Sequence, residues 1–145
     1  MKYTIETTIN RPKKEVVALY DNIPNLYKWM EGLESVKLIS GEEGKKGAKT
    51  EMVFKTPKRV MTMTETILQN DLPDKMVTSY QADGVYNIIF TEFHENGEQT
   101  LYRTIQEFKF KGFMRIIGFF FPKAFKKQSL KYMEDFKTFV ENQED

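Results

Sequence analysis

The stretch from residue 33 to residue 111 limits the fold more than any other part of the chain. It reads as extended segments separated by five turn signals, which are GEEGKKG at 41–47, TPKR at 56–59, DLPD at 71–74, ADG at 82–84 and HENGE at 94–98. Five turns separate six strands, and strands joined by such short links are antiparallel neighbours. This stretch therefore predicts an antiparallel sheet.

The residues before this stretch predict one more strand and two short helices. Residues 3–9 (YTIETTI) alternate with the period of two that is typical of a strand. A helix is expected to run to about Tyr20, with Asn10 as its cap and Pro12 in its first turn. A second short helix is expected over IPNLYKWM at 23–30. The predicted sheet then has seven strands.

The last segment, from about residue 112 to residue 142, predicts a long helix with a kink or a weak first third at Pro122. Its second half has an amphipathic stripe that is expected to pack on the sheet. This stripe comprises Leu130, Met133, Phe136 or Lys137, and Val140. Its first half, GFMRIIGFFFPKAF at 112–125, is apolar nearly all round, so it is covered, faces a partner or lines an enclosed space.

Length and composition exclude several classes of protein. A chain of 145 residues is expected to form a single domain, 1–145. The 22 basic and 21 acidic side chains leave no charge excess for a nucleic-acid partner. The apolar run at 113–121 is shorter than the roughly 20 residues that span a bilayer, so we expect no transmembrane segment. The N-terminus lacks the apolar run of a signal peptide, so we expect a cytoplasmic protein.

Motifs for metal, cofactor or nucleophilic chemistry are missing from the sequence. The chain has no cysteine, which excludes disulfides, thiolate catalysis and cysteine metal ligands. His94 is the single histidine and lies beside the ENG turn, where a surface role is expected. There is no HExxH, paired DxD or GxSxG motif, and GEEGKKG lacks the GK[ST] ending of a phosphate-binding loop. We therefore expect no metal and no cofactor.

Three segments resemble the START-like superfamily, also called SRPBCC, in its small bacterial polyketide cyclase/dehydrase-like branch. They are INRPKKEVVALYDNIPNLYKWMEGLESVKLI at 9–39, NDLPDKMVTSY at 70–80 and EFKFKGFMRIIGFFFP at 107–122. The resemblance covers essentially the whole chain. It implies an α+β helix-grip fold, in which a seven-stranded curved antiparallel sheet wraps around a long C-terminal helix and two short helices lie between strands 1 and 2. It also implies an apolar cavity between sheet and helix, while it leaves ligand and reaction open.

Strand alternation predicts which side chains face this cavity. The predicted inward set is Met52, Phe54, Met61, Met63, Glu65, Ile67, Met76, Thr78, Tyr80, Tyr86, Ile88, Phe90, Tyr102, Thr104, Gln106 and Phe108. The residues expected to close the space are Trp29, Met30, Met114, Ile117, Phe121 and Phe125. An apolar wall with a few polar groups is typical of a small-molecule pocket, and equally of a core whose polar residues are satisfied.

The first half of the long helix is interpreted as a gate-like wall. Ile117 and Phe121 are expected to point inward, and some of Phe113, Phe119 and Phe120 are expected to be exposed or to form a dimer contact. The lysines at 123, 126, 127 and 131 are interpreted as a solvated helix face, and attraction to an anionic head group or membrane is the alternative.

Glu65 is the weak candidate for a catalytic residue. An inward carboxylate costs several kcal/mol unless it is paired or neutral, and buried acids with a raised pKa often act as acid/base catalysts. A register shift of one residue would turn Glu65 to solvent.

Three hypotheses for function follow. The first is binding or transport of a small hydrophobic or amphipathic ligand, such as a lipid, an isoprenoid or an aromatic polyketide-like compound. The second is a cyclase or dehydratase-type enzyme that uses an inward Glu or Tyr as acid/base. The third is an interaction or homodimerisation module that uses the Phe-rich helix.

Overall fold

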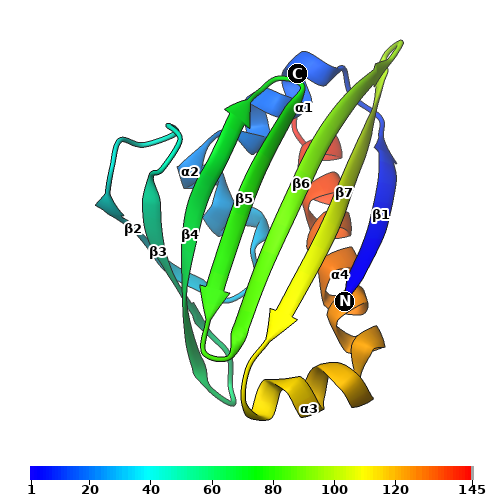
Figure 1. The fold of residues 1–145 in the computed structure, drawn as a ribbon. Coiled ribbons are helices and arrows are strands. Elements are labelled where there is room, and N and C mark those ends of the chain that lie inside the picture. Colours follow the sequence, from blue (N-terminus) through cyan, green and yellow to red (C-terminus); the bar gives the residue numbers. More distant parts are fainter. Residues whose placement is uncertain (145) are drawn as a thin grey trace.

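The computed structural model describes residues 1–144, which form one sheet and four helices (Figure 1). The elements follow in the order β1 (Lys2–Ile9), α1 (Lys13–Tyr20), α2 (Ile23–Trp29), β2 (Leu33–Ser40), β3 (Lys49–Lys55), β4 (Val60–Asp71), β5 (Lys75–Ala82), β6 (Val85–Asn96), β7 (Gln99–Phe110), α3 (Phe113–Phe120) and α4 (Pro122–Glu141). All five predicted turns separate strands, and the predicted helix-grip order is confirmed except that the last helix is divided.

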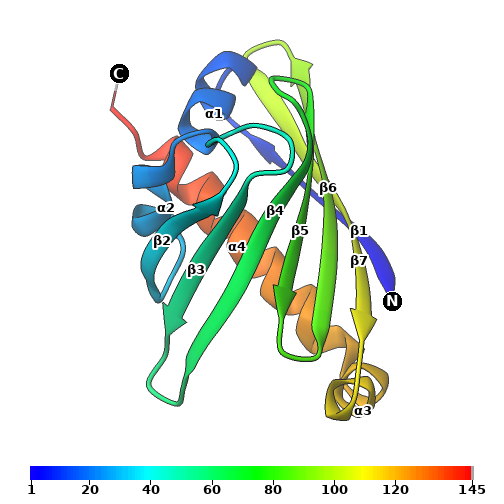
Figure 2. The same cartoon turned by 60° about the vertical axis from the view of Figure 1, so that its left-hand side comes forward.

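The sheet is antiparallel throughout, with the strand order β1-β7-β6-β5-β4-β3-β2. Strands β2 to β7 are neighbours in chain order because short turns join them, and β1 is added beside β7. The sheet curves around α4, which runs along its concave side (Figure 2). Of the strands, α4 contacts β1 most extensively, so α4 lies toward one edge of the sheet.

The two short helices start differently from each other. Residue Pro12 precedes α1 with φ −62° and ψ 148°, and no side chain caps this helix. The prediction of Asn10 as the cap is therefore wrong, because α1 begins at Lys13 and Pro12 takes the cap position. The backbone N–H of Asn10 donates to a carboxylate oxygen of Glu141 at 2.7 Å. In α2 the side chain of Asn22 accepts a hydrogen bond from the backbone N–H of Asn25 at 3.1 Å, which satisfies a free donor of the first turn.

The C-terminal helix breaks into two helices at Phe121. This residue ends α3 with φ −128° and ψ 49°, and Pro122 begins α4. Proline has no N–H to continue the ladder of the preceding helix, and it fits a first helical turn. The kink predicted at Pro122 is therefore a complete break, and α3 turns away from α4 beneath the end of β7 (Figure 1).

The core lies at the end of the molecule where α1 and α2 cover the sheet. Phe136 of α4 is fully buried, with its ring centroid 5.6 Å from that of Tyr20 and 5.5 Å from that of Tyr102. Met133 and Val140 of the predicted stripe are buried as well, whereas Leu130 is 36% exposed. Burying such large apolar side chains contributes about 1.5–3 kcal/mol each.

Candidate functional site

The strand register defines one face of the sheet that is turned toward α4. Directly paired residues lie on the same face, and the sheet pairs Glu65 with Tyr80, and Met52 with Met63. The predicted inward position is confirmed for Met52, Phe54, Met63, Glu65, Thr78, Tyr80, Tyr102, Thr104 and Gln106. Whether these residues bind a ligand remains a prediction.

Strand β6 presents the opposite set of residues from the predicted one. Its concave side chains include Ile89 and Phe93, which pair with Gln106 and Tyr102 of β7. The convex face instead carries Tyr86, Ile88 and Phe90. Their predicted place in the cavity wall is therefore wrong. The turns on both sides of β6 contain two residues, so every even-numbered residue of β5 or β7 pairs with an odd-numbered residue of β6.

The concave residues missed by this one-residue error are Asn87, Ile89, Thr91 and Phe93. The sequence contained the signal for them. The inward residues predicted on β5 and β7 have even numbers, and a two-residue turn on each side of β6 places its odd-numbered residues on the same face.

Part of the concave face is not packed against α4. Phe93 is buried in the core, whereas Met61, Met63, Glu65, Tyr80 and Ile89 keep partial solvent exposure. We call the area that these five partly exposed residues line the recess. On the β3 side α4 approaches the sheet through Tyr132, whose ring centroid lies 6.5 Å from that of Phe54.

A hydrogen-bonded pair of one tyrosine and one glutamate lies in the wall of the recess. The hydroxyl of Tyr80 donates to Oε2 of Glu65 at 2.6 Å. Burial raises the pKa of Glu65, and the hydrogen bond from Tyr80 opposes this shift. Burial, followed by the charge of Glu65, holds the pKa of Tyr80 well above 10.0.

Tyr20, at the end of α1, lies beside this pair. Burial raises its pKa to about 12, with an opposing contribution from the Thr91 hydroxyl and a further increase from the charge of Glu65. The ring packs edge-on against Phe93 at 5.1 Å between centroids. Tyr20 therefore separates the recess from the solid core, and its position on the apolar face of α1 was the signal for this role.

Polar side chains connect β7 to α4 deeper in the concave face. Ser129 of α4 donates to Oε1 of Gln106 at 3.1 Å, and Nε2 of Gln106 lies 3.3 Å from the hydroxyl oxygen of Thr104. The hydroxyl of Tyr3 lies 2.6 Å from Ser129 Oγ. Gln106 is buried and bonds to Ser129, so it holds the helix to the sheet, while Thr104 accepts from the Gln106 amide. Ser129 was missed because the set predicted from the long helix contained only apolar side chains.

Trp29 and Met30 lie elsewhere than predicted. They line a separate pocket of about 530 Å³ between α2, the start of β2 and the end of α4. Trp29 is also buried against Phe136, with 5.1 Å between ring centroids. These two residues therefore close the core end of the molecule rather than the recess.

Helix α3 lies at the opposite end. Met114 and Ile117 are partly buried there, and Gly84 approaches Met114 so closely that a Cβ on Gly84 would lie 2.8 Å from Met114 Cγ. Phe121 was predicted to point inward, but it is exposed because the chain breaks at this residue. The exposure predicted for some of Phe113, Phe119 and Phe120 is confirmed.

The structure offers no obvious metal centre. Within residues 1–144, no three His, Asp or Glu side chains come together as a metal site requires. His94 is exposed, and its Nε2 lies 2.7 Å from Oε1 of Glu92. None of the helices in this part of the chain is both long and apolar enough to cross a membrane.

A curved antiparallel sheet that grips a long C-terminal helix defines the helix-grip class of START-like proteins. Residues 1–141 match the family described as polyketide cyclase / dehydrase and lipid transport. The chain belongs to this family, and the resemblance to the START-like superfamily is confirmed. A sequence search of curated proteins found no match.

Solved structures share the fold over nearly the whole chain. Ara h 8.0201 superposes with a TM-score of 0.80 at 12% identity, covering 99% of both chains. The Zhui aromatase/cyclase from a Streptomyces species has a TM-score of 0.79 at 10% identity, covering 97% of this chain and 93% of the other. Norcoclaurine synthase from Thalictrum flavum, solved with dopamine and hydroxybenzaldehyde, has a TM-score of 0.71 at 14% identity, covering 100% and 89%.

Proposed function

We propose that the protein binds and carries a small amphipathic molecule in the recess. The observation that carries this proposal is the composition of the recess wall, where Met61, Met63 and Ile89 surround the single polar pair Glu65–Tyr80. Apolar side chains supply affinity in such sites, and a few polar groups orient the ligand. Methionine adapts to ligands of irregular shape, which suits a lipid, an isoprenoid or an aromatic polyketide-like compound.

The pair also suggests how the ligand is oriented. Tyr80 occupies Oε2 of Glu65, and within residues 1–144 no donor bonds to Oε1. A hydroxyl or ammonium group of the ligand would complete the hydrogen bonding of this partly buried carboxylate. The apolar part of the ligand would then lie along the methionines.

Ligand binding is tested by native mass spectrometry of freshly purified protein and by displacement of the neutral dye Nile red with farnesol, an isoprenoid alcohol. Met63→Trp fills the recess and should abolish dye binding. Val60→Trp adds the same ring to an exposed position of the same strand and should leave dye binding unchanged. If the native protein binds neither dye nor farnesol and carries no ligand, the proposal is wrong.

The head-group contact is tested separately. The methyl ether of farnesol lacks the hydroxyl donor and should bind more weakly than farnesol to the native protein. In Glu65→Gln the preference for farnesol should fall by about threefold to tenfold, since a neutral amide oxygen accepts a weaker hydrogen bond than a carboxylate does. An unchanged preference would show that Glu65 does not orient the ligand.

A second candidate function is acid/base catalysis of the cyclase or dehydratase type. It is favoured by the raised pKa of Glu65, because a carboxyl whose pKa is closer to neutral exchanges protons with a substrate more effectively. The family description includes cyclases and dehydrases. If the protein is an enzyme, Glu65→Gln should abolish turnover of a polyketide-like substrate while Nile red binding persists. If it is a carrier, neither the native protein nor the variant should turn the substrate over.

A further inference from the structure

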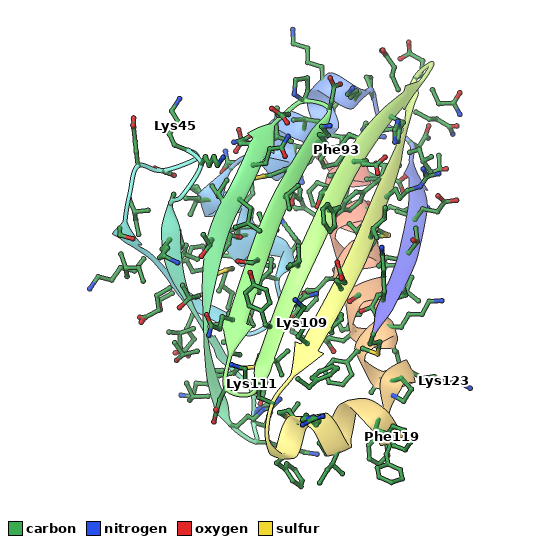
Figure 3. The ribbon with its side chains drawn as sticks, viewed as in Figure 1. Lys45, Phe93, Lys109, Lys111, Phe119 and Lys123 are labelled. Carbon is green, nitrogen blue, oxygen red and sulfur yellow. The ribbon has the colours of Figure 1, made fainter. Side chains whose placement is uncertain are left out.

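Helix α3 presents an apolar stripe to solvent. The exposed fractions are 70% for Phe113, 52% for Ile116, 79% for Phe119, 66% for Phe120 and 58% for Phe121. Their spacing places the first four along one side of the helix, and Phe121 continues the stripe where the helix ends. Figure 3 shows Phe119 pointing away from the body of the protein. So many large apolar side chains in one exposed patch mark an interaction surface.

Close packing holds α3 in this orientation. A Cβ on Gly118 would lie 2.6 Å from two ring carbons of Phe110, so the helix backbone rests directly on the end of β7. Gly84 meets the side chain of Met114 in the same way. The other side of α3 is therefore occupied by the sheet, and the stripe is the side that remains.

Basic side chains surround the stripe. Residues 108–133 contain seven Lys or Arg and no Asp or Glu, and since the whole chain has a net charge of +1, the rest of it has a net charge of −6. Six of these cations are exposed and form no ion pair within residues 1–144; they are Lys109, Lys111, Arg115, Lys123, Lys126 and Lys127. We call these six residues the basic collar. Figure 3 shows Lys111 and Lys123 beside the two ends of α3, and Lys109 on β7 above it.

Lys131 differs from the collar. It lies 2.9 Å from a carboxylate oxygen of Glu31 and 2.6 Å from one of Asp135. Acidic partners therefore balance the charge near Lys131, as the interpretation of a solvated helix face requires, while the collar around α3 has none among residues 1–144.

We propose that α3 docks on the surface of a membrane that contains anionic lipids. The apolar stripe would enter the boundary between head groups and acyl chains, and the basic collar would pair with lipid phosphates. A second copy of the chain fits this face less well, because it would bring two basic collars together. Since α3 is too short to cross a bilayer, it lies in the plane of the surface.

Docking would serve the transfer of a ligand, but vesicle binding and ligand binding are measured in separate experiments. If the recess carries a ligand, as proposed above, docking brings the protein to the place where a membrane-soluble ligand is collected or delivered. Vesicle binding itself requires no ligand, so it is measured on protein stripped of ligand by organic extraction and refolding. A protein that binds vesicles but not Nile red would overturn the function proposed above and leave the docking inference standing.

The experiment is flotation of the full-length protein with two kinds of vesicle, phosphatidylcholine alone and phosphatidylcholine mixed with phosphatidylglycerol. We expect the protein to float with the mixed vesicles and much less with phosphatidylcholine alone. Raising the salt from about 0.1 M to about 1 M should weaken binding, since the Debye length falls from about 10 Å to about 3 Å.

Paired variants separate the two contributions. Phe119→Ser with Phe120→Ser should lower partitioning onto mixed vesicles by about tenfold or more. Val60→Ser with Ile39→Ser, which also removes two exposed apolar side chains, should not change partitioning. Lys111→Glu with Lys123→Glu should weaken partitioning about tenfold or more. Lys45→Glu with Lys46→Glu changes charge equally in the turn between β2 and β3, and should have a smaller effect.

Three results would overturn the inference. The first is native protein that fails to float with mixed vesicles. The second is flotation that persists undiminished in the Phe119→Ser, Phe120→Ser variant. The third is a native protein that is dimeric by sedimentation velocity and does not bind vesicles, while the same variant is monomeric. A second copy of the chain would then occupy the stripe. Circular dichroism confirms that each variant is folded.

Discussion

Tyr80 donates a 2.6 Å hydrogen bond to Glu65 from the neighbouring strand, in a part of the concave face that solvent still reaches. The two residues are directly paired between β4 and β5, so the sheet register itself holds them together. This contact gives the otherwise apolar recess one polar position. Burial raises the pKa of the Glu65 carboxyl, and the hydrogen bond from Tyr80 opposes this shift.

The first prediction concerns the pH dependence of stability. Burial raises the pKa of Glu65 above 4.5, so between 4.5 and the raised value the folded protein binds more protons than the unfolded chain does. The contribution of Glu65 to the free energy of unfolding therefore falls as pH rises through this window. Glu65→Gln removes that contribution, so the variant should gain stability relative to native protein as pH increases. Urea unfolding over a pH series measures the difference, and a difference that is independent of pH would contradict the raised pKa.

The second prediction concerns the hydrogen bond itself. Tyr80→Phe leaves the Glu65 carboxylate without its donor and should lower the free energy of unfolding at neutral pH by about 1–3 kcal/mol. The pKa of Glu65 should rise further, because the hydrogen bond from Tyr80 lowers it. Tyr86→Phe makes the same change on the convex face and should have little effect. Carboxyl carbon NMR and urea unfolding measure both quantities, and equal effects of the two variants would show that the pair is unimportant.

The third prediction separates the buried and exposed positions of α4. Phe136 is fully buried against Tyr20 and Tyr102, so Phe136→Ala should cost about 3–5 kcal/mol of unfolding free energy. Leu130→Ala, at an exposed position of the same helix, should cost less than about 1 kcal/mol. Thermal or denaturant unfolding measures the stability of both variants. A large loss of stability in Leu130→Ala would mean that α4 packs differently along its length.

The fourth prediction concerns the attachment of α3. Gly→Ala within a helix usually stabilises by about 0.5–1 kcal/mol, but a Cβ on Gly118 would lie 2.6 Å from the Phe110 ring. Phe110 is itself stacked on Phe108 and packed against Phe125, which restricts its movement. Gly118→Ala should therefore reduce the hydrogen-exchange protection of the α3 amides, and adding Phe110→Leu should restore it. Increased protection in the single variant would show that α3 does not rest on β7.

The order of strands and helices was predictable from the sequence because each turn has its own local signal. The five turns separate the strands where Gly, Pro, Asn and Asp cluster, and the family resemblance supplied the curved sheet around the last helix. The sequence also contained enough information to predict which side chains of β6 face α4. The apolar character of Ile88 and Phe90 nevertheless led to the wrong set. Their convex face is partly apolar too, so hydrophobicity alone does not distinguish the faces, whereas the two-residue turns do.

Other features depend on tertiary packing that local patterns do not reveal. Pro122 indicated an interruption, but the outward direction of Phe121 depends on the angle at which α3 leaves β7. Trp29 was expected near the ligand because it is large and apolar, yet its position depends on how α2 meets Phe136. The open area of the recess depends on α4 lying toward the β1 edge, which no single segment encodes.

The most direct test of ligand binding in the recess uses NMR of protein labelled at the methionine methyl groups. Met61 and Met63 line the recess, Met133 lies in the solid core, Met114 lies on α3 and Met1 is exposed at the N-terminus. Addition of farnesol should shift the Met61 and Met63 signals and leave those of Met133 and Met1 in place. Unchanged Met61 and Met63 signals at saturating farnesol, or shifts confined to Met114, would contradict ligand binding in the recess.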